Sequence, residues 1–166
     1  VDSATQVTLN ANCSADGTDI TFTKTPIAKI LDADFITTGA PNGAFVEMDG
    51  YLFYPDATNV RNSDLNSIIA YTATANKAVD MAPDNVVALA RSKNVILALG
   101  TGSTQGFQNA GYATGSPLER ISQTFSRIGA QGQSSVSTLE NDIFFVGSSN
   151  YGDTQAWRIR DFTPQK

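Results

Sequence analysis

The side chains that could do chemistry in this chain are its carboxylates, because histidine is absent and cysteine occurs once, at Cys13. Without histidine there is no Ser-His-Asp or Cys-His nucleophile system and no imidazole metal ligand. A single cysteine can form neither an internal disulfide nor a thiolate cage for a metal. The sequence therefore predicts no catalytic residue, no metal site and no cofactor-binding site, and we expect a protein that is not an enzyme.

Two acidic residues with a suggestive spacing are Asp32 and Asp34. If this segment were a strand, both side chains would face the same way and could form half of a cation site. Calcium, however, takes six or more oxygen ligands, and no other acidic run is evident in the chain. The sequence favours a polar loop that leads into the first sheet.

A second set of carboxylates surrounds an expected hairpin. Glu47 together with Asp49 or Asp56 could be imagined as the acid and nucleophile of a glycosidase. Side chains on a tight hairpin are usually solvated, and nothing in the sequence places these residues across a cleft. We therefore expect no such catalytic pair.

Exposed aromatic residues would be the means of binding a ligand or glycan. Tyr112, Tyr151 and Trp157 are the stacking candidates, although isolated aromatics more often pack in a core. The segment 148–152 faintly resembles an Asp-box turn but lacks its aspartate, and we interpret it as an ordinary loop. Asn12-Cys13-Ser14 formally matches an N-glycosylation acceptor, which we interpret as coincidence because nothing indicates secretion.

The charge and hydrophobicity of the chain restrict the kinds of partner that are expected. The chain has 166 residues, 16 acidic and 11 basic side chains, and a net charge of -5. An acidic chain is a poor candidate for gripping a nucleic-acid backbone, so no sequence-specific nucleic-acid binding is predicted. No apolar run reaches the roughly 18 residues of a membrane span, and no signal peptide is visible. The chain starts at Val1 rather than Met, and we expect a piece of a longer protein.

The pattern along the chain predicts short antiparallel strands. Three stretches share one form, an apolar strand, a short polar turn and a second apolar strand: FVEMDGYLFY, VVALARSKNVILALG and VSTLENDIFFVG. Asp49-Gly50 is a strong type I′ turn signal. Further strands are expected at 4–11, 19–24, 59–61, 104–108 and 155–159, whereas 67–77 could be strand or helix. The residues expected to be buried are Phe45, Leu52, Val87, Leu89, Val95, Leu97, Leu99, Ile143, Phe145 and Trp157.

The three hairpins recur at roughly 45-residue spacing, which is the blade period of a β-propeller. The predicted fold class is all-β, with antiparallel meander blades in a single propeller-type domain, or part of one, over residues 1–166. About three to four blades fit in this length, too few to close a ring of typical size. The expected architecture is therefore an incomplete propeller.

The order of several short motifs resembles one protein family. They are ILDADF, AFVEMDGYLFY, SDLN, ATANKAVDMAPDNVVALA, LGTGSTQGFQNAG, LERI, LENDIFFVG and FTPQK, spread over about residues 27–166. This order is similar to that of the packaged-DNA stabilisation proteins, or tail accessory factors, of short-tailed bacteriophages. Gln105 departs from the acidic residue usual in that family.

The resemblance implies a structural β-propeller of the virion tail. It implies a homo-oligomeric ring that meets portal or adaptor proteins on one side and tail-tip proteins on the other, and that seals the channel to retain packaged DNA. The alternative left open is a ligand- or glycan-binding propeller without catalysis. Glycan binding, or co-purification with other particle proteins, would distinguish these functions.

Overall fold

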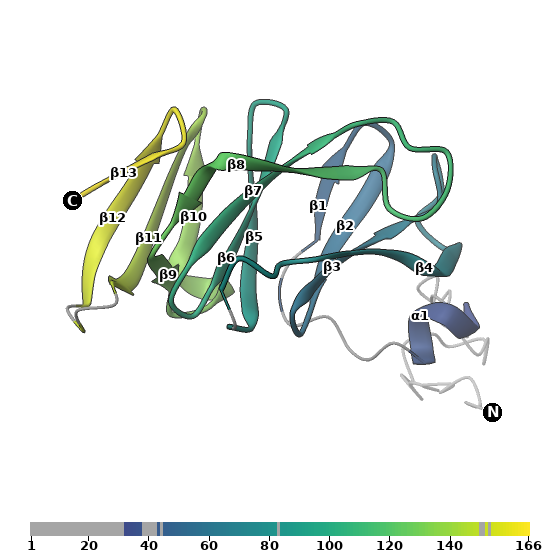
Figure 1. Ribbon diagram of the computed structural model, residues 1–166, viewed down its shortest axis with the longest axis horizontal. Coiled ribbons are helices and arrows are strands. Elements are labelled where there is room, and N and C mark those ends of the chain that lie inside the picture. Colours follow the sequence, from purple (N-terminus) through teal and green to yellow (C-terminus); the bar gives the residue numbers. More distant parts are fainter. Residues whose placement is uncertain (1–31, 38–42, 44, 83, 150–151, 153) are drawn as a thin grey trace, which may run out of the picture.

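The computed structural model describes residues 32–37, 43, 45–82, 84–149, 152 and 154–166. These residues form three antiparallel sheets that follow one another along the chain and lie side by side (Figure 1). Within each sheet, consecutive strands are hydrogen-bonded neighbours. The predicted all-β class with successive meander sheets is confirmed. The strands expected at 4–11 and 19–24 lie outside the described residues.

The first sheet has the order β1-β2-β3-β4. Its strands are β1 (Val46–Met48), β2 (Tyr51–Asp56), β3 (Asn59–Ser63) and β4 (Tyr71–Ala78). Asp49 and Gly50 both have positive φ, 54° and 81°, as the predicted type I′ turn requires. The segment 67–77, which periodicity left open, contributes a strand rather than a helix.

The second sheet has the order β5-β6-β7-β8 and occupies the middle of the structure (Figure 1). Its strands are β5 (Val86–Ser92), β6 (Val95–Gly100), β7 (Thr104–Asn109) and β8 (Leu118–Ser126). Every residue of β6 is buried. A strand with two buried faces needs a continuous apolar run rather than alternation, and VILALG provides one.

The third sheet is built around β11 (Asp142–Ser149), with β12 (Thr154–Arg160) and β13 (Thr163–Gln165) following it. On its other side β11 pairs with two short strands, β9 (Ile128–Ala130) and β10 (Val136–Leu139). A 3₁₀ turn, η1 (Gln133–Ser135), separates these two strands. The strand beside β11 is thus interrupted once.

Two hydrophobic cores lie between the three sheets, and β6 contributes side chains to both. Ile96 and Ala98 belong to the core between the first and second sheets, whereas Val95, Leu97 and Leu99 belong to the core between the second and third. This division follows from the two-residue period of a strand. The first core also contains Met48, Phe53, Val60, Val79, Val86, Leu89, Phe107 and Leu118, and the second contains Ala88, Ala90, Ala130, Ile143, Phe145, Trp157 and Ile159.

The predicted core needs three corrections, all of them matters of strand phase. Phe45 is 41% exposed, because Val46 and Met48 face the first core and alternation turns Phe45 to the opposite face. Leu52 is half-buried for the same reason, since its neighbour Phe53 faces inward. Val87 is also half-buried and lies at an irregularity in the pairing of β5 with β6. The other seven predicted core residues are buried.

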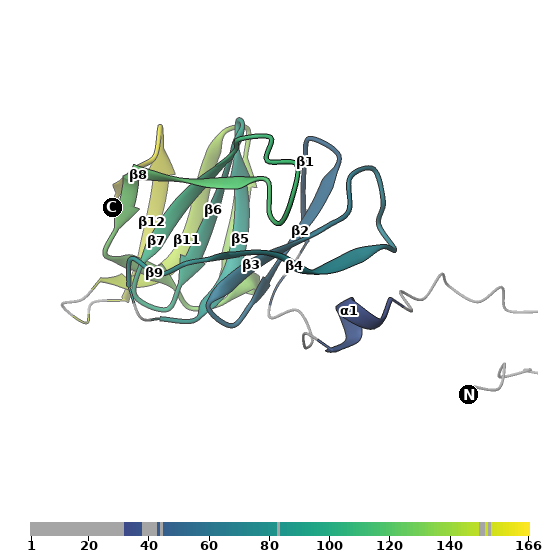
Figure 2. The same cartoon turned by 45° about the vertical axis from the view of Figure 1, so that its right-hand side comes forward.

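A short helix, α1 (Ala33–Thr37), packs beside β4 on the first sheet (Figures 1 and 2). Phe35 on this helix meets Phe45, Tyr54 and Tyr71, with ring centroids 4.8–6.5 Å apart. These four rings form an aromatic cluster on the face of the first sheet that points away from the first core. Helix α1 was not predicted, since a polar loop was expected at Asp32 and Asp34, and it partly covers this face of the first sheet.

Candidate functional site

The acidic residues singled out in the sequence bind backbone amides. The Asp32 carboxylate accepts hydrogen bonds from the amides of Asp34 (2.9 Å) and Tyr71 (3.3 Å). The Asp34 carboxylate accepts one from the amide of Ala73 at 3.0 Å. Both therefore serve the edge of β4, whose outward N–H groups would otherwise lack partners in the sheet. No group of three or more potential metal ligands occurs in the part of the chain that the structure describes.

The three carboxylates near the first hairpin each have a different partner. Glu47 lies 3.2 Å from the guanidinium of Arg91, and Asp56 lies 2.5 Å from that of Arg61. Asp49 accepts a hydrogen bond of 2.9 Å from the side-chain amide of Asn109. None of the three lines the groove described below. This arrangement resembles structural pairing, not an acid and nucleophile facing a common substrate.

The aromatic stacking candidates have different fates. Trp157 is only 7% exposed and belongs to the second core, so its interpretation as a surface stacking residue is wrong. Tyr112 is 48% exposed, in the loop between β7 and β8. Tyr151 and Asn150 lie outside the described residues, whereas Ser148 and Ser149 belong to β11.

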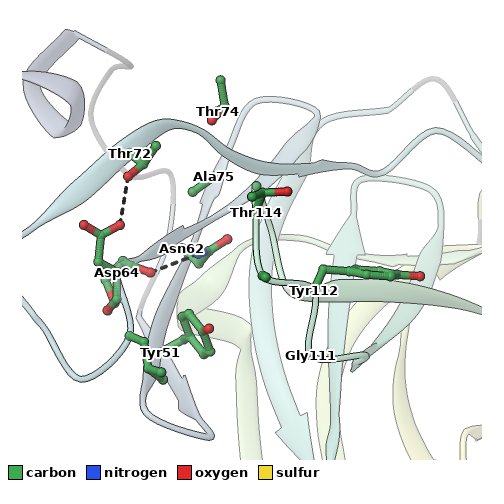
Figure 3. A pocket seen from close by; sticks show the side chains of 13 residues that line it. Tyr51, Asn62, Asp64, Thr72, Thr74, Ala75, Gly111, Tyr112 and Thr114 are labelled. Atoms are coloured by element: carbon green, nitrogen blue, oxygen red, sulfur yellow. Dashed lines mark hydrogen bonds between the residues drawn. The ribbon is translucent and has the colours of Figure 1, made fainter.

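A groove of about 650 Å³ lies between the first sheet and the loop that joins β7 to β8 (Figure 3). One wall comes from β2, β3 and β4 and the turn after β3; the other comes from the loop, which Tyr112 and Thr114 mark in the figure. The lining residues are Tyr51, Asn62, Ser63, Asp64, Leu65, Thr72, Thr74, Ala75 and 111–115. None of them is a lysine or an arginine, so the groove carries no cation of its own.

The groove contains a buried acceptor without a partner. Asn62 is 3% exposed; its Nδ2 donates to the Ser63 carbonyl at 2.9 Å, and its Oδ1 has no hydrogen-bond partner. In Figure 3 the Asn62 oxygen points away from that carbonyl, into the space between Ala75 and Thr114. Beside it, Thr72 Oγ1 donates to Asp64 Oδ1 at 2.9 Å. No signal in the sequence indicated that Asn62 and Asp64 contribute to a groove.

Another uncovered surface is the outward face of the third sheet. Phe144 and Val146 alternate with the buried Ile143 and Phe145, and they are 38% and 43% exposed. Leu139, on the neighbouring strand, is 66% exposed. We call Leu139, Phe144 and Val146 the outer apolar face. Among the described residues, no segment of the chain covers it as α1 covers the first sheet.

The basic side chains are largely engaged with carboxylates. The described residues contain ion pairs of Arg61 with Asp56, Arg91 with Glu47, Lys93 with Asp161, Arg120 with Asp80 and Arg160 with Asp142. Two of them join different sheets, since Arg91 and Lys93 belong to the second sheet and their partners to the first and third. Cations held in this way do not form the basic face that a nucleic-acid backbone requires.

Two local environments shift the pKa of side chains in this structure. Burial, with smaller contributions from Tyr54 and Asp32, raises the pKa of the Tyr71 phenol, whose hydroxyl donates to the Ile68 carbonyl. The hydrogen bond from Arg160 lowers the pKa of the Asp142 carboxyl, and the same contact raises the pKa of Arg160. Both sites lie on sheet edges or turns and neither lines the groove, so these shifts report structure rather than catalysis.

The second and third sheets approach each other through glycine. A Cβ on Gly129 would lie 2.3 Å from the backbone carbon of Thr101, and one on Gly147 would lie 1.9 Å from the Gly129 carbonyl oxygen. Asp84 fixes the turn that meets Gly129, because its carboxylate accepts from the Gly102 amide and the Ser103 hydroxyl, both at 2.8 Å. Nothing in the sequence indicated this close packing.

A family model described as phage stabilisation, "Bacteriophage P22 Gp10, beta-propeller", matches residues 8–166. A search of the curated proteins finds no match. In the described part of the chain, no helix is long and apolar enough to cross a membrane.

Proposed function

We propose, from the premise that this chain belongs to the phage stabilisation family of bacteriophage P22 Gp10 β-propellers, that it helps to seal the tail channel and retain packaged DNA. The family match over residues 8–166 is the observation that carries the proposal, and it indicates a structural phage protein. The proposed location is the tail of the virion. The proposed mechanism is mechanical: the three packed sheets form a stiff body that occupies a position in the tail and blocks leakage of DNA.

The packing supports such stiffness. The central sheet buries both of its faces, and burying one large apolar side chain contributes about 1.5–3 kcal/mol. Polar contacts then connect neighbouring sheets at the end where their hairpin turns lie. Ser92 Oγ donates to the Asn141 carbonyl at 2.6 Å, and Lys93 Nζ lies 2.8 Å from Asp161. Sheets held by cores and by such ties resist sliding past one another.

The charge distribution supports a wall that does not grip DNA. The net charge is -5, and five of the basic side chains are paired with carboxylates in the described structure. A duplex that must leave through a channel during ejection would be slowed by a basic lining, because each phosphate contact adds affinity. An acidic protein with paired cations avoids that contact.

The proposed assembly is a homo-oligomeric ring in contact with portal or adaptor proteins and tail-tip proteins. The outer apolar face gives this assembly a candidate contact, because exposed adjacent apolar side chains on a sheet favour association. The occupant we propose is a further propeller sheet, since the cores on both sides of the second sheet show the type of surface that packs against such a face.

The test is made in virions. Mass spectrometry of purified particles should detect the chain, and particles made without it should package DNA but lose it on storage, measured as nuclease-sensitive DNA per particle. A Phe144→Ser variant should lower incorporation into particles, whereas Tyr112→Ser, a change of similar exposure on a loop, should be incorporated normally. Absence of the chain from particles, or full DNA retention without it, would refute the proposal.

A further inference from the structure

We propose that the groove between the first sheet and the β7–β8 loop binds a neutral saccharide. This site is separate from the outer apolar face, and the inference does not depend on DNA retention. It concerns a polar recess of about 650 Å³, within the usual size range of small-molecule sites. Three features of its lining define the class of ligand.

The first feature is the unpartnered oxygen of Asn62. Because Nδ2 is bonded to the Ser63 carbonyl, the free group is the acceptor Oδ1, on a side chain that is 97% buried. A buried acceptor without a donor is costly, and buried polar atoms in native structures usually have a protein or water partner. A ligand hydroxyl that donates to Oδ1 would remove this cost.

The second feature is a lining of hydroxyls and one carboxylate with no cation. Thr74 and Thr114 bring hydroxyls that can both donate and accept. Thr72 already donates to Asp64, so its hydroxyl and the Asp64 carboxylate offer acceptors only. An anionic ligand such as a phosphate or a sialic acid would face the Asp64 charge without a compensating arginine or lysine. A neutral ligand with several hydroxyl groups fits this set.

The third feature is an apolar surface beside the polar groups. Tyr51 packs against the first core and turns part of its half-buried ring toward the groove in Figure 3. The exposed Tyr112 stands on the loop at the opposite wall, with its ring directed away from Tyr51 in Figure 3, so Tyr51 supplies the aromatic surface. A pyranose has apolar C–H faces and a hydroxyl edge, so it can use an aromatic wall and the polar lining together. Phosphate, metal ions and purely apolar ligands cannot use both of these surfaces.

The loop wall has a defined shape. Its base is closed by a 2.8 Å hydrogen bond from the Ala110 amide to the Pro117 carbonyl. Gly111 and Gly115 adopt positive φ, 70° and 75°, at the two ends of the part that lines the groove. The Gly111 amide also donates to Asn109 Oδ1 at 2.8 Å. A wall fixed by these contacts keeps the groove open without a ligand.

The experiment measures binding of maltotriose, cellotriose and triacetylchitotriose to the purified protein by saturation-transfer NMR and calorimetry, with 3′-sialyllactose as the anionic probe. At least one neutral trisaccharide should bind, with roughly millimolar affinity because the groove offers few hydrogen bonds. The sialylated probe should not bind. Absence of binding by all three neutral sugars would overturn the proposal, as would equal binding of 3′-sialyllactose.

Variants locate the site. Thr74→Val removes one exposed hydroxyl and should weaken binding about fivefold, the value of one net hydrogen bond. Thr154→Val is the matched control on the third sheet, and Thr114→Trp should abolish binding by filling the groove. Asn62→Leu should weaken binding at least as much as Thr74→Val. Sugar binding that is unchanged by Thr114→Trp would refute the site. If the wild-type protein binds none of the sugars and Thr114→Trp loses ring assembly, the groove binds a protein segment instead.

Discussion

Leu97→Ala tests the packing on which the stiffness of the protein depends. Leu97 is 1% exposed in the core between the second and third sheets, and it packs over Gly106, which has no side chain to fill the space. The substitution removes three carbons, worth about 0.8 kcal/mol each when buried, or about 2.4 kcal/mol. A residual cavity adds to this, so the expected loss of unfolding free energy is about 2–5 kcal/mol.

The assay is urea unfolding followed by tryptophan fluorescence, because Trp157 belongs to the same core. With an m-value of about 2 kcal/mol/M, the midpoint should fall by about 1–2.5 M. Leu139→Ala is the matched control: Leu139 is 66% exposed, and its removal should change the free energy by less than about 0.5 kcal/mol. A loss below about 0.5 kcal/mol for Leu97→Ala would mean that the strand phase of β6 is wrong.

Three further changes probe other contacts. Asp84→Ala removes two charge-assisted hydrogen bonds to the 102–103 turn and should cost about 2–4 kcal/mol by urea unfolding, against less than about 1 kcal/mol for Asp80→Ala; equal costs would contradict this role. Gly129→Ala should cost more than Gly111→Ala, whose new Cβ meets nothing within 4 Å and carries only the positive-φ penalty of about 1 kcal/mol; the reverse order would exclude the close approach. Asp142→Asn should lower the free energy of unfolding most at neutral pH. The difference from wild type should shrink as pH falls below about 4, because a lowered carboxyl pKa stabilises the fold only while the group is ionised. A difference in unfolding free energy that does not depend on pH would exclude the contact with Arg160 as the cause.

Local chemistry explains which elements the sequence predicted. The turn Asp49-Gly50 requires two positive φ angles, and Asp-Gly is suited to them, so the first hairpin and its register follow from the residues themselves. The run VILALG could only be a strand with two buried faces or a short buried helix, and the flanking turns decide for the strand. Such signals depend on neighbours in the chain.

The elements that were missed depend on partners far away in the sequence. Strand β8 alternates weakly and has only two buried residues, so only its pairing with β7 reveals it. Strand β13 has three residues, including Pro164, and forms only against β12. Helix α1 is five residues long, too short to be stable by itself, and Phe35 holds it on the first sheet.

The groove illustrates the same limit for a site. Asn62 and Asp64 come from β3 and the turn after it, and Thr114 comes from a loop about fifty residues later. No spacing in the sequence indicates that these residues meet. Tyr112 was a stacking candidate from its type alone, and the structure supplies its neighbours. Trp157 was a candidate on the same ground, but the β12 phase turns it into the core.

The asymmetry of the three sheets bears on how such a protein can be both stiff and able to associate. The second sheet packs against a hydrophobic core on each face, so it supplies rigidity. The first sheet ends in the aromatic cluster under α1, with Asp32 and Asp34 bonded to the β4 edge, and this covering discourages pairing with another strand there. The third sheet keeps its outer apolar face open. Exposed apolar side chains on the third sheet therefore direct association to that side of the protein.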